Sequence, residues 1–258
     1  MFPAQPFPTR FCSRHAPQSV EPAGGLVPAN WFSSLVPASS LTSATPVERW
    51  SLANALGMIA ATGAAVWTGG IWPLLVVGGG LLGALLVVAR GRWTPQGRFG
   101  PANGVTALRA GLLVLLPLAA AGSPTLLIGL GLLVLAADGL DGWLARRGDL
   151  DSEFGAFFDK ETDALFLLLL CALAAFEDRL PVWILGAGLL RYAFVPLLFV
   201  LPAPRKTEER SSWARYVYTA MVLALLMSFL PVPALYLPVV ALAGGALVLS
   251  FARSLWRI

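Results

Sequence analysis

Two pairs of aspartates lie within the stretch DGLDGWLARRGDLDSEFGAFFDKETD, which runs from Asp138 to Asp163. Asp138 and Asp141 are three residues apart, and Asp159 and Asp163 are four residues apart. On a helix either spacing places the two side chains on a shared face, so two helices would present four carboxylates to one cavity. Carboxylate oxygens suit hard divalent cations such as Mg²⁺ or Mn²⁺, which also hold substrate phosphates. The pattern therefore predicts a metal site suited to phosphate chemistry.

The composition places this motif in a membrane protein. Hydrophobic residues make up 57% of the 258 residues, charged residues make up only 12%, and the mean hydropathy is +0.74. Soluble domains have about 25% charged residues. An aspartate at the centre of a membrane helix costs about 2.5 to 3.5 kcal/mol, so four of them without a partner would carry a large penalty. A bound cation would offset that penalty.

Apolar segments separated by short polar or proline-containing turns predict an all-α, polytopic membrane helix bundle. Residues 1–50, rich in proline and serine, are expected to form a disordered or surface-lying tail. A charge-free run that is split near Gly69 predicts a transmembrane helical hairpin over 51–90, followed by a cytoplasmic linker at 91–103. We expect eight membrane helices, at residues 52–68, 71–90, 104–121, 124–145, 154–176, 180–201, 213–230 and 232–252.

Arginine and lysine set the expected orientation, because cytoplasmic loops carry an excess of both. If the tail and the linker are cytoplasmic, only Arg179 is left for the opposite loops, and the aspartate motif opens toward the cytoplasm. Sixteen arginines against two lysines suggest a GC-rich bacterial genome, and hence the inner (cytoplasmic) membrane of a bacterium. The net charge of +4 is scattered over the loops without an aromatic-interleaved stripe, which argues against nucleic acid as a partner.

Small residues and an arginine accompany the carboxylates. Gly142 and Ala145 leave the surface of the first helix bare, and Gly155 repeats this arrangement one turn before Asp159. Arg146 can bind a pair of phosphate oxygens. Two metal ions held between the helices would stabilise the attacking and leaving oxygens of an in-line displacement, and an uncommitted carboxylate could take the proton of an attacking hydroxyl. The pattern predicts transfer of a substituted phosphoryl group.

The stretch as a whole resembles the signature of the CDP-alcohol phosphatidyltransferases, integral membrane enzymes of phospholipid synthesis. The signature D-x2-D-G-x2-A-R-x8-G-x3-D-x3-D is matched at all eight defining positions, which makes the resemblance highly specific. Members of this family have a six-helix core with the motif across its second and third helices. The resemblance thus implies a catalytic core over 104–258, preceded here by a tail and a hairpin that the simplest members lack.

The resemblance also implies roles for individual residues. Asp138, Asp141 and Asp159 would be metal ligands for two Mg²⁺ or Mn²⁺ ions, and Asp163 would contribute to the metal site and serve as the catalytic base. Asn103 and Thr106, together with Arg109, resemble the Asn, Thr and Arg at the cytoplasmic start of the first core helix. The residues expected to bind the nucleotide are Asp138, Gly142, Ala145, Arg146, Gly155, Asn103 and Thr106. Family members also suggest a homodimer.

Two further arginines are candidates for binding the acceptor. Arg191, in the middle of the sixth segment, would be costly if it faced lipid, so it should face the cavity or pair with a carboxylate. Arg215, at the start of the seventh segment, could point at the same cavity. In the alternative interpretation Arg191 pairs structurally and Arg215 extends to the lipid headgroups. Asn103 likewise has an alternative, as a helix N-cap that follows a proline.

We therefore expect an enzyme that transfers a phosphatidyl group from a CDP-linked donor, CDP-diacylglycerol, to the hydroxyl of a small polar acceptor and releases CMP. Glycerol 3-phosphate is favoured over myo-inositol phosphate and serine, because it is the commonest acceptor among bacterial relatives. A second arrangement keeps this chemistry but has diacylglycerol attack a soluble CDP-alcohol. A divalent-cation transporter would instead distribute acidic residues along a path through the membrane, whereas here they crowd toward one face beside an arginine.

Overall fold

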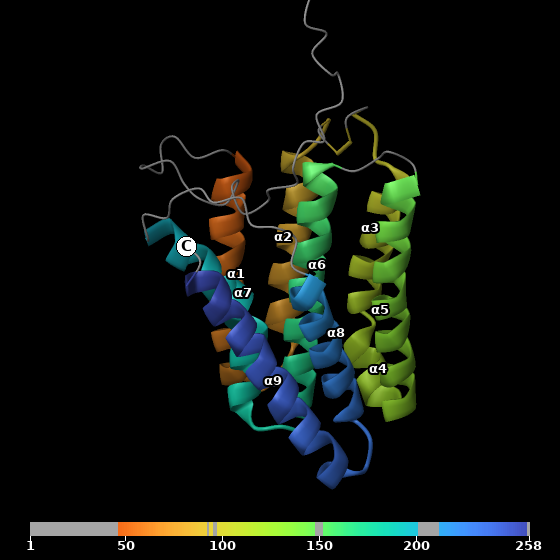
Figure 1. Cartoon of the computed structure of the whole chain (residues 1–258), viewed down its shortest axis with the longest axis vertical. Coiled ribbons are helices and arrows are strands. Elements are labelled where there is room, and N and C mark those ends of the chain that lie inside the picture. The colour runs from red at the N-terminus through yellow and green to blue at the C-terminus, as the bar shows by residue number, and fades with distance from the viewer. Residues whose placement is uncertain (1–45, 92, 95–96, 148–151, 201–211, 257–258) are drawn as a thin grey trace, which may run out of the picture.

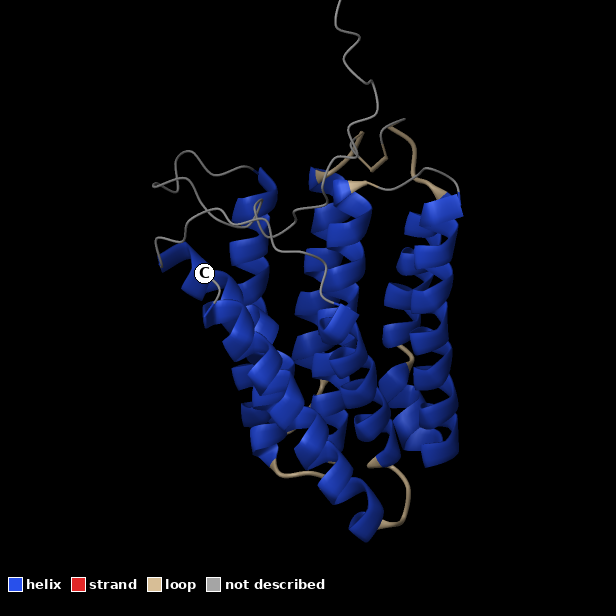
Figure 2. Ribbon diagram, viewed as in Figure 1, coloured by secondary structure: helices blue, strands red, loops and turns tan. Residues whose placement is uncertain are grey.

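The computed structural model describes residues 46–91, 93–94, 97–147, 152–200 and 212–256. Within these residues the chain is helical and has no strand, which confirms the expected all-α membrane bundle (Figure 2). The elements are α1 (Pro46–Thr68), α2 (Trp72–Val88), α3 (Pro101–Leu113), α4 (Leu116–Gly122), α5 (Pro124–Arg147), α6 (Glu153–Phe176), the short 3₁₀ helix η1 (Val182–Ile184), α7 (Leu185–Val200), α8 (Ser212–Met227) and α9 (Pro233–Trp256).

Prolines begin many of these helices. Pro73, Pro101 and Pro117 stand in the first turns of α2, α3 and α4, where the missing N–H would have no partner within the helix. Pro117 also explains a difference from the expected segments. The single helix expected at 104–121 is broken into α3 and α4, which are bent by 44°, because the ring of Pro117 would clash with the carbonyl of Leu113 in a continuous helix.

Helix α6 lies at the centre of the bundle. It contacts α2, α3, α7 and α8, and residues 164–175 are buried around the whole circumference of the helix. Such a helix is apolar on every side because it has no face turned to the surroundings. Around it, α1 pairs with α2, α3 with α5, and α8 with α9 (Figure 1). Each of these pairs thus contacts α6 through one of its members, α2, α3 or α8.

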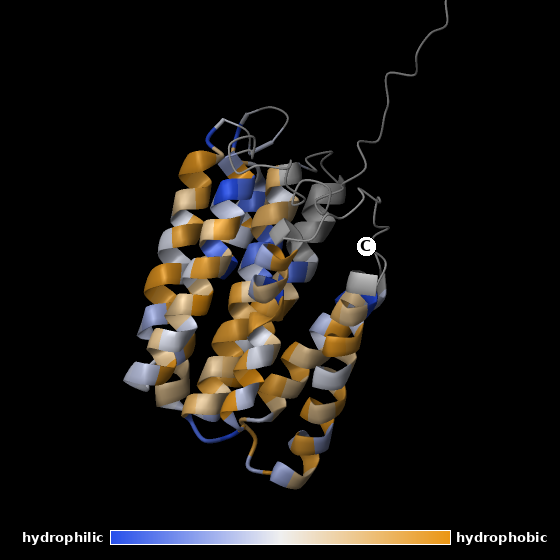
Figure 3. Ribbon diagram, turned by 90° about the vertical axis from the view of Figure 1, so that its left-hand side faces the viewer, coloured by the Kyte–Doolittle hydropathy of each residue, from blue (hydrophilic) through white to orange (hydrophobic). Residues whose placement is uncertain are grey.

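The outer surface is apolar, as expected for helices in lipid. Large side chains such as Val76, Leu242 and Leu249 are exposed, and Figure 3 shows hydrophilic helical positions gathered toward one end of the bundle. By length and composition, two of the described helices can cross a membrane, α1 and Pro233–Arg253 of α9, or three if the bent pair α3–α4 is one span. Other apolar helices are shorter than 18 residues, so the number of eight spans stays a prediction.

The first helix begins earlier than expected, at Pro46 instead of residue 52. The tail predicted at 1–50 lies outside the described residues except for its last five positions, which form the first turns of α1. Helices α1 and α2 occupy the region of the predicted hairpin, and they contact α7 and α6 respectively. The division of the chain into tail, hairpin, linker and core stays a prediction, but the hairpin region packs directly on helices of the expected core.

Candidate active site

Three of the four aspartates of the motif surround one arginine. Asp138 comes from α5, Asp159 and Asp163 come from α6, and Arg109 comes from α3. Nη1 of Arg109 lies 2.6 Å from Oδ1 of Asp159 and 3.2 Å from Oδ1 of Asp138, and its Nη2 donates to Oδ1 of Asp163 at 2.5 Å. The contacts of α3 with α5 and with α6 thus bring together residues that are up to 54 positions apart.

The charges of this cluster do not balance. Arg109 is only 1% exposed, whereas the side chains of Asp138, Asp159 and Asp163 are 24%, 33% and 21% exposed. Three carboxylates and one guanidinium leave two negative charges among these four side chains, in a largely apolar bundle where unbalanced charge is costly. One oxygen from each carboxylate lies within 4.8 Å of the others. This set of hard oxygen donors, with its surplus negative charge, fits a divalent cation.

The start of α6 is tied to the chain segment that precedes α3. Ser152 caps α6, because its Oγ accepts a hydrogen bond from the Gly155 amide at 2.9 Å. The same hydroxyl donates to the carbonyl of Trp93 at 2.7 Å, and Nδ2 of Asn103 donates to that carbonyl at 3.0 Å. A Cβ on Gly155 would approach Oδ1 of Asn103 to 2.7 Å. A larger residue at position 155 would therefore displace the hydrogen-bonded side chains of Asn103 and Ser152.

A model of the CDP-alcohol phosphatidyltransferase family matches residues 99–252, which is more than half of the chain. The chain belongs to the CDP-alcohol phosphatidyltransferase family. It is therefore an enzyme that transfers substituted phosphate groups in phospholipid synthesis. This membership favours a transferase over the divalent-cation transporter. No curated protein and no solved structure matches the chain. Enzymes of this family use a divalent metal, in agreement with the carboxylate cluster.

The expected nucleotide-binding residues of this phosphatidyltransferase are described in part. Asn103 and Thr106 are buried on α3, about two turns and one turn before Arg109. The N-cap alternative for Asn103 is wrong, because α3 begins at Pro101 with Gly100 as its cap. The Thr106 hydroxyl donates a hydrogen bond to the Ala102 carbonyl of the same helix at 3.2 Å. The side chains of four further expected site residues lie outside the described ones, although their backbone is part of α5: Asp141, Gly142, Ala145 and Arg146.

The two arginines expected to bind the acceptor lie in different settings. Arg191 on α7 is 16% exposed and forms an ion pair with Glu161 of α6, which is 2% exposed. Arg215, near the start of α8, is exposed. Neither residue has a contact with the aspartate cluster among the described interactions. Their role toward the acceptor stays a prediction, and the pairing of Arg191 matches the structural alternative.

Sequence reasoning missed three residues of the site and its surroundings. Arg109 was noted as part of the family resemblance but was not expected to bridge the carboxylates. Its position in an apolar helix was a signal, because buried arginines need acidic partners. Glu161 lies inside the motif at a position that the signature leaves open. Tyr218 of α8 donates from its hydroxyl to the Asp163 carbonyl at 3.3 Å, and nothing in the sequence pointed to that contact.

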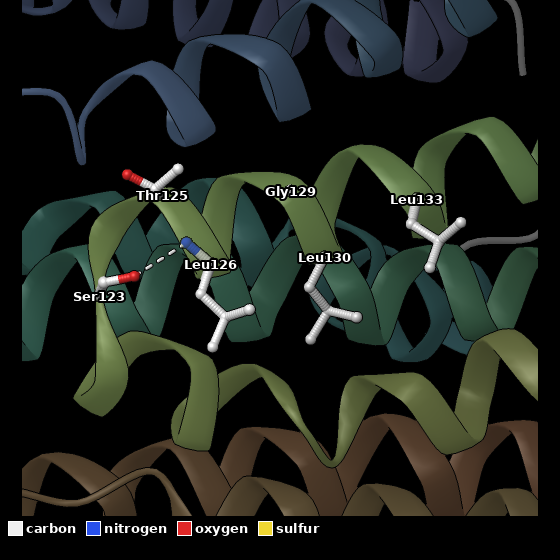
Figure 4. A pocket seen from close by; sticks show the side chains of 6 residues that line it. All are labelled: Ser123, Thr125, Leu126, Gly129, Leu130 and Leu133. Atoms are coloured by element: carbon white, nitrogen blue, oxygen red, sulfur yellow. Dashed lines mark hydrogen bonds between the residues drawn. The ribbon is translucent and has the colours of Figure 1, made fainter.

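The hollow shown in Figure 4 is not part of this site. It has a volume of about 520 Å³ and lies along the first turns of α5. Leu126 and Leu133, two of its lining residues, are more than half exposed. The lining residues on α5 precede Asp138 by 5 to 13 residues, or about 8 to 20 Å along the helix axis, and no residue of the aspartate cluster is among them. An open, leucine-lined groove at this position is part of the lipid-facing surface. The lining residues are Ser123, Thr125, Leu126, Gly129, Leu130 and Leu133.

Proposed function

We propose that this phosphatidyltransferase moves the phosphatidyl group of CDP-diacylglycerol to the hydroxyl of a small polar acceptor, with glycerol 3-phosphate favoured, and releases CMP. The observation that carries the proposal is the cluster of Asp138, Asp159 and Asp163, with two negative charges in excess of Arg109. A diphosphate bound with divalent cations matches that excess. Myo-inositol phosphate and serine are the next acceptors to test, because both also offer a hydroxyl on a small polar molecule.

We assign the metal ligands to Asp138, Asp141, Asp159 and Asp163, which would hold two Mg²⁺ or Mn²⁺ ions. Bound ions would neutralise the diphosphate and stabilise charge on its oxygens. Gly142, Ala145, Arg146 and Gly155, with Asn103 and Thr106, would line the nucleotide site. Small residues let the diphosphate approach the backbone, and the guanidinium fork of Arg146 can hold two phosphate oxygens.

In this reaction Asp163 acts as the base and Arg109 holds the carboxylates in position. Asp163 takes the proton of the acceptor hydroxyl as that oxygen forms its bond to the β-phosphorus. The bond between the β-phosphorus and the bridging oxygen breaks, and the electron pair leaves with CMP. Arg109 engages Oδ1 of Asp163, which leaves Oδ2 to receive the proton. The guanidinium also fixes Asp159 through a second nitrogen, so Arg109 orients two of the reacting carboxylates at once.

We further propose that the site faces the cytoplasm at the inner membrane of a bacterium and that the enzyme forms a homodimer. The orientation is supported by the distribution of arginine and lysine. A cytoplasmic site would have direct access to a soluble acceptor. Arg215 remains the proposed contact of that acceptor, where a cationic side chain would pair with its phosphate, whereas the ion pair of Arg191 with Glu161 favours the structural alternative for Arg191.

The test is CMP release by the purified full-length chain in detergent micelles with Mn²⁺. One set of reactions contains CDP-diacylglycerol with glycerol 3-phosphate, myo-inositol phosphate or serine. A second set contains diacylglycerol with soluble CDP-alcohols, and EDTA serves as the metal-free control. We expect CMP only in the first set, most with glycerol 3-phosphate, and none with EDTA. CMP in the second set alone would reverse the donor and acceptor, and no CMP in either set would refute the proposed function.

A further inference from the structure

A second buried polar cluster lies on the other side of α6. Nδ2 of Asn54, from α1, donates to Oε2 of Glu161 at 2.8 Å. Nη2 of Arg191, from α7, donates to Oε1 of the same carboxylate. Asn54 is 4% exposed and Glu161 is 2–3% exposed. The two oxygens of Glu161 are thus engaged by two different helices, one of which belongs to the N-terminal region that precedes the family match at residue 99.

Glu161 and the catalytic aspartates occupy opposite faces of α6. Each residue of an α-helix turns by about 100°, so Glu161 is about 160° away from both Asp159 and Asp163. One face is directed toward α3 and α5 through Arg109. The other is directed toward α1 and α7 through Asn54 and Arg191. Any rotation of α6 about its axis would therefore disturb both clusters together.

Contacts above and below Glu161 continue this second face. Phe157 lies one turn before it and packs edge-on against Trp50 of α1, with ring centroids 5.5 Å apart and planes at 75°. Residues 157, 161 and 165 have the i, i+4, i+8 spacing of a single stripe. Nε1 of Trp50 in turn donates to the Leu81 carbonyl of α2 at 2.9 Å. The hairpin therefore meets α6 as one connected unit.

The third residue of the stripe, Leu165, packs against α2. A Cβ on Gly78 would lie 2.7 Å from Cδ1 of Leu165, so a larger residue there would force the Leu165 side chain to shift. By contrast, a Cβ on the neighbouring residues Gly79 and Gly80 would meet nothing within 4 Å. The close approach is confined to the position that faces α6. An aromatic contact, a hydrogen bond to a charge and a close contact with Gly78 together hold this face of α6 against the hairpin.

We propose that Asn54 is a positioning residue for the metal-binding aspartates, acting through Glu161 and α6. This inference rests on the proposed function for the role of the aspartates. The geometry requires a donor at residue 54, because Glu161 is a buried carboxylate whose second oxygen is served from α1. Partly satisfied buried networks are costly and allow side chains to shift. Loss of the donor would let α6 relax, and Asp159 and Asp163 would no longer hold their positions beside Arg109.

The principal test is Asn54→Leu, which removes the donor at similar volume. Mn²⁺ binding to the full-length protein is titrated without substrate, from the electron paramagnetic resonance signal of the free ion. CMP release then gives kcat and KM for CDP-diacylglycerol. Loss of a partner bonded directly to a metal ligand weakens metal binding or activity about 10- to 100-fold, and Asn54 acts less directly, through Glu161. We expect a loss at the lower end of that range, about tenfold, in Mn²⁺ affinity and in kcat, with KM for the donor unchanged.

Thr62→Val is the matched control. Thr62 is also buried on α1, but its hydroxyl donates to the Met58 carbonyl of the same helix at 2.8 Å. This variant removes one buried hydrogen bond of α1 without touching α6, and it should leave Mn²⁺ affinity and kcat as in the wild type. Wild-type Mn²⁺ affinity in Asn54→Leu would overturn the proposal. An equal loss in Thr62→Val would do so as well, because a general weakening of α1 would then explain both results.

A swap of chemical groups keeps the proposal testable even if Asn54→Leu does not fold. Asn54→Asp alone sets a second carboxylate against Glu161 and should weaken Mn²⁺ binding. Adding Glu161→Gln restores one carboxylate and one amide at this contact, and we expect the Mn²⁺ affinity to return in part, because Arg191 then faces an amide instead of a carboxylate. No recovery in the double variant would contradict the inference. If the wild type releases no CMP at all, the proposed function fails, while Mn²⁺ binding still tests the role of Asn54.

Discussion

On one face of α6, Asp159 and Asp163 share Arg109 with Asp138, and their side chains keep 33% and 21% of their surface exposed. On the opposite face, Glu161 has Arg191 and Asn54 as partners and is 2% exposed. Each face carries an arginine, 1% exposed for Arg109 and 16% exposed for Arg191, and among the described side chains Arg109 faces three carboxylates whereas Arg191 faces one. A balanced and covered ion pair favours a structural role, whereas surplus charge that remains accessible favours a ligand.

The strongest test of this contrast makes the same change on both faces. Asp159→Asn should lower kcat by about 10³-fold or more, or ~4 kcal/mol of transition-state stabilisation, and should leave the protein folded because it reduces the surplus negative charge. Glu161→Gln should retain more activity but destabilise the fold by about 3 kcal/mol, since it removes the buried carboxylate that pairs with Arg191. CMP release and thermal unfolding, followed by intrinsic fluorescence, would measure both effects.

The reverse outcome would break the contrast between the two faces. If Asp159→Asn unfolded the protein and Glu161→Gln abolished turnover in a fully stable protein, the catalytic and structural assignments would have to be exchanged. Retention of most activity in Asp159→Asn would contradict metal catalysis at this site altogether.

The aspartate face was predictable from the sequence because it depends on spacing within two helices. Asp159 and Asp163 must share a face if α6 forms, and the fixed interval from Asp138 places that residue on the neighbouring helix α5. The opposite face was not predictable. Asn54 is an isolated polar residue in an arm without charge, and no local periodicity says which helix it will meet.

The remaining differences have equally physical causes. Pro117 breaks a segment that hydropathy alone treats as continuous, because an average over apolar residues does not register a missing N–H. Arg109 was named by resemblance, yet its place among three carboxylates depends on the packing of α3 against both α5 and α6. Tertiary contacts between distant helices decide such positions, and one-dimensional patterns carry little information about them.

A second prediction concerns the cation that the protein itself supplies. Arg109→Lys keeps the charge but loses the planar fork that contacts three carboxylates, so kcat should fall between about 10- and 100-fold. Arg109→Gln removes the charge. Because the guanidinium repels a metal ion at the same carboxylates, Mn²⁺ binding without substrate should become tighter in Arg109→Gln, by about tenfold from the Coulomb energy at short range, even though kcat falls.

Weaker Mn²⁺ binding, the opposite of the expected result, would change the comparison between the two faces of α6. If Arg109→Gln bound Mn²⁺ more weakly, Arg109 would serve to hold the carboxylates in place more than it competes with the ion. The two faces of α6 would then resemble each other, each with an arginine whose main task is to order acidic side chains.

The smallest effect on kcat is expected for Tyr218 of α8, which contacts the aspartate-bearing face only through the backbone of α6. The Tyr218 hydroxyl donates to the Asp163 carbonyl at 3.3 Å, a long hydrogen bond that leaves the carboxylate untouched. Tyr218→Phe should therefore lower kcat no more than about threefold, which corresponds to the lower range for a single neutral hydrogen bond. Tyr236→Phe is the matched control, since its hydroxyl donates to the Arg179 carbonyl at 3.4 Å, away from the cluster. A large loss of kcat in Tyr218→Phe alone would mean that α8 also positions Asp163. Two neighbouring helices would then hold this aspartate, α3 through Arg109 and α8 through Tyr218.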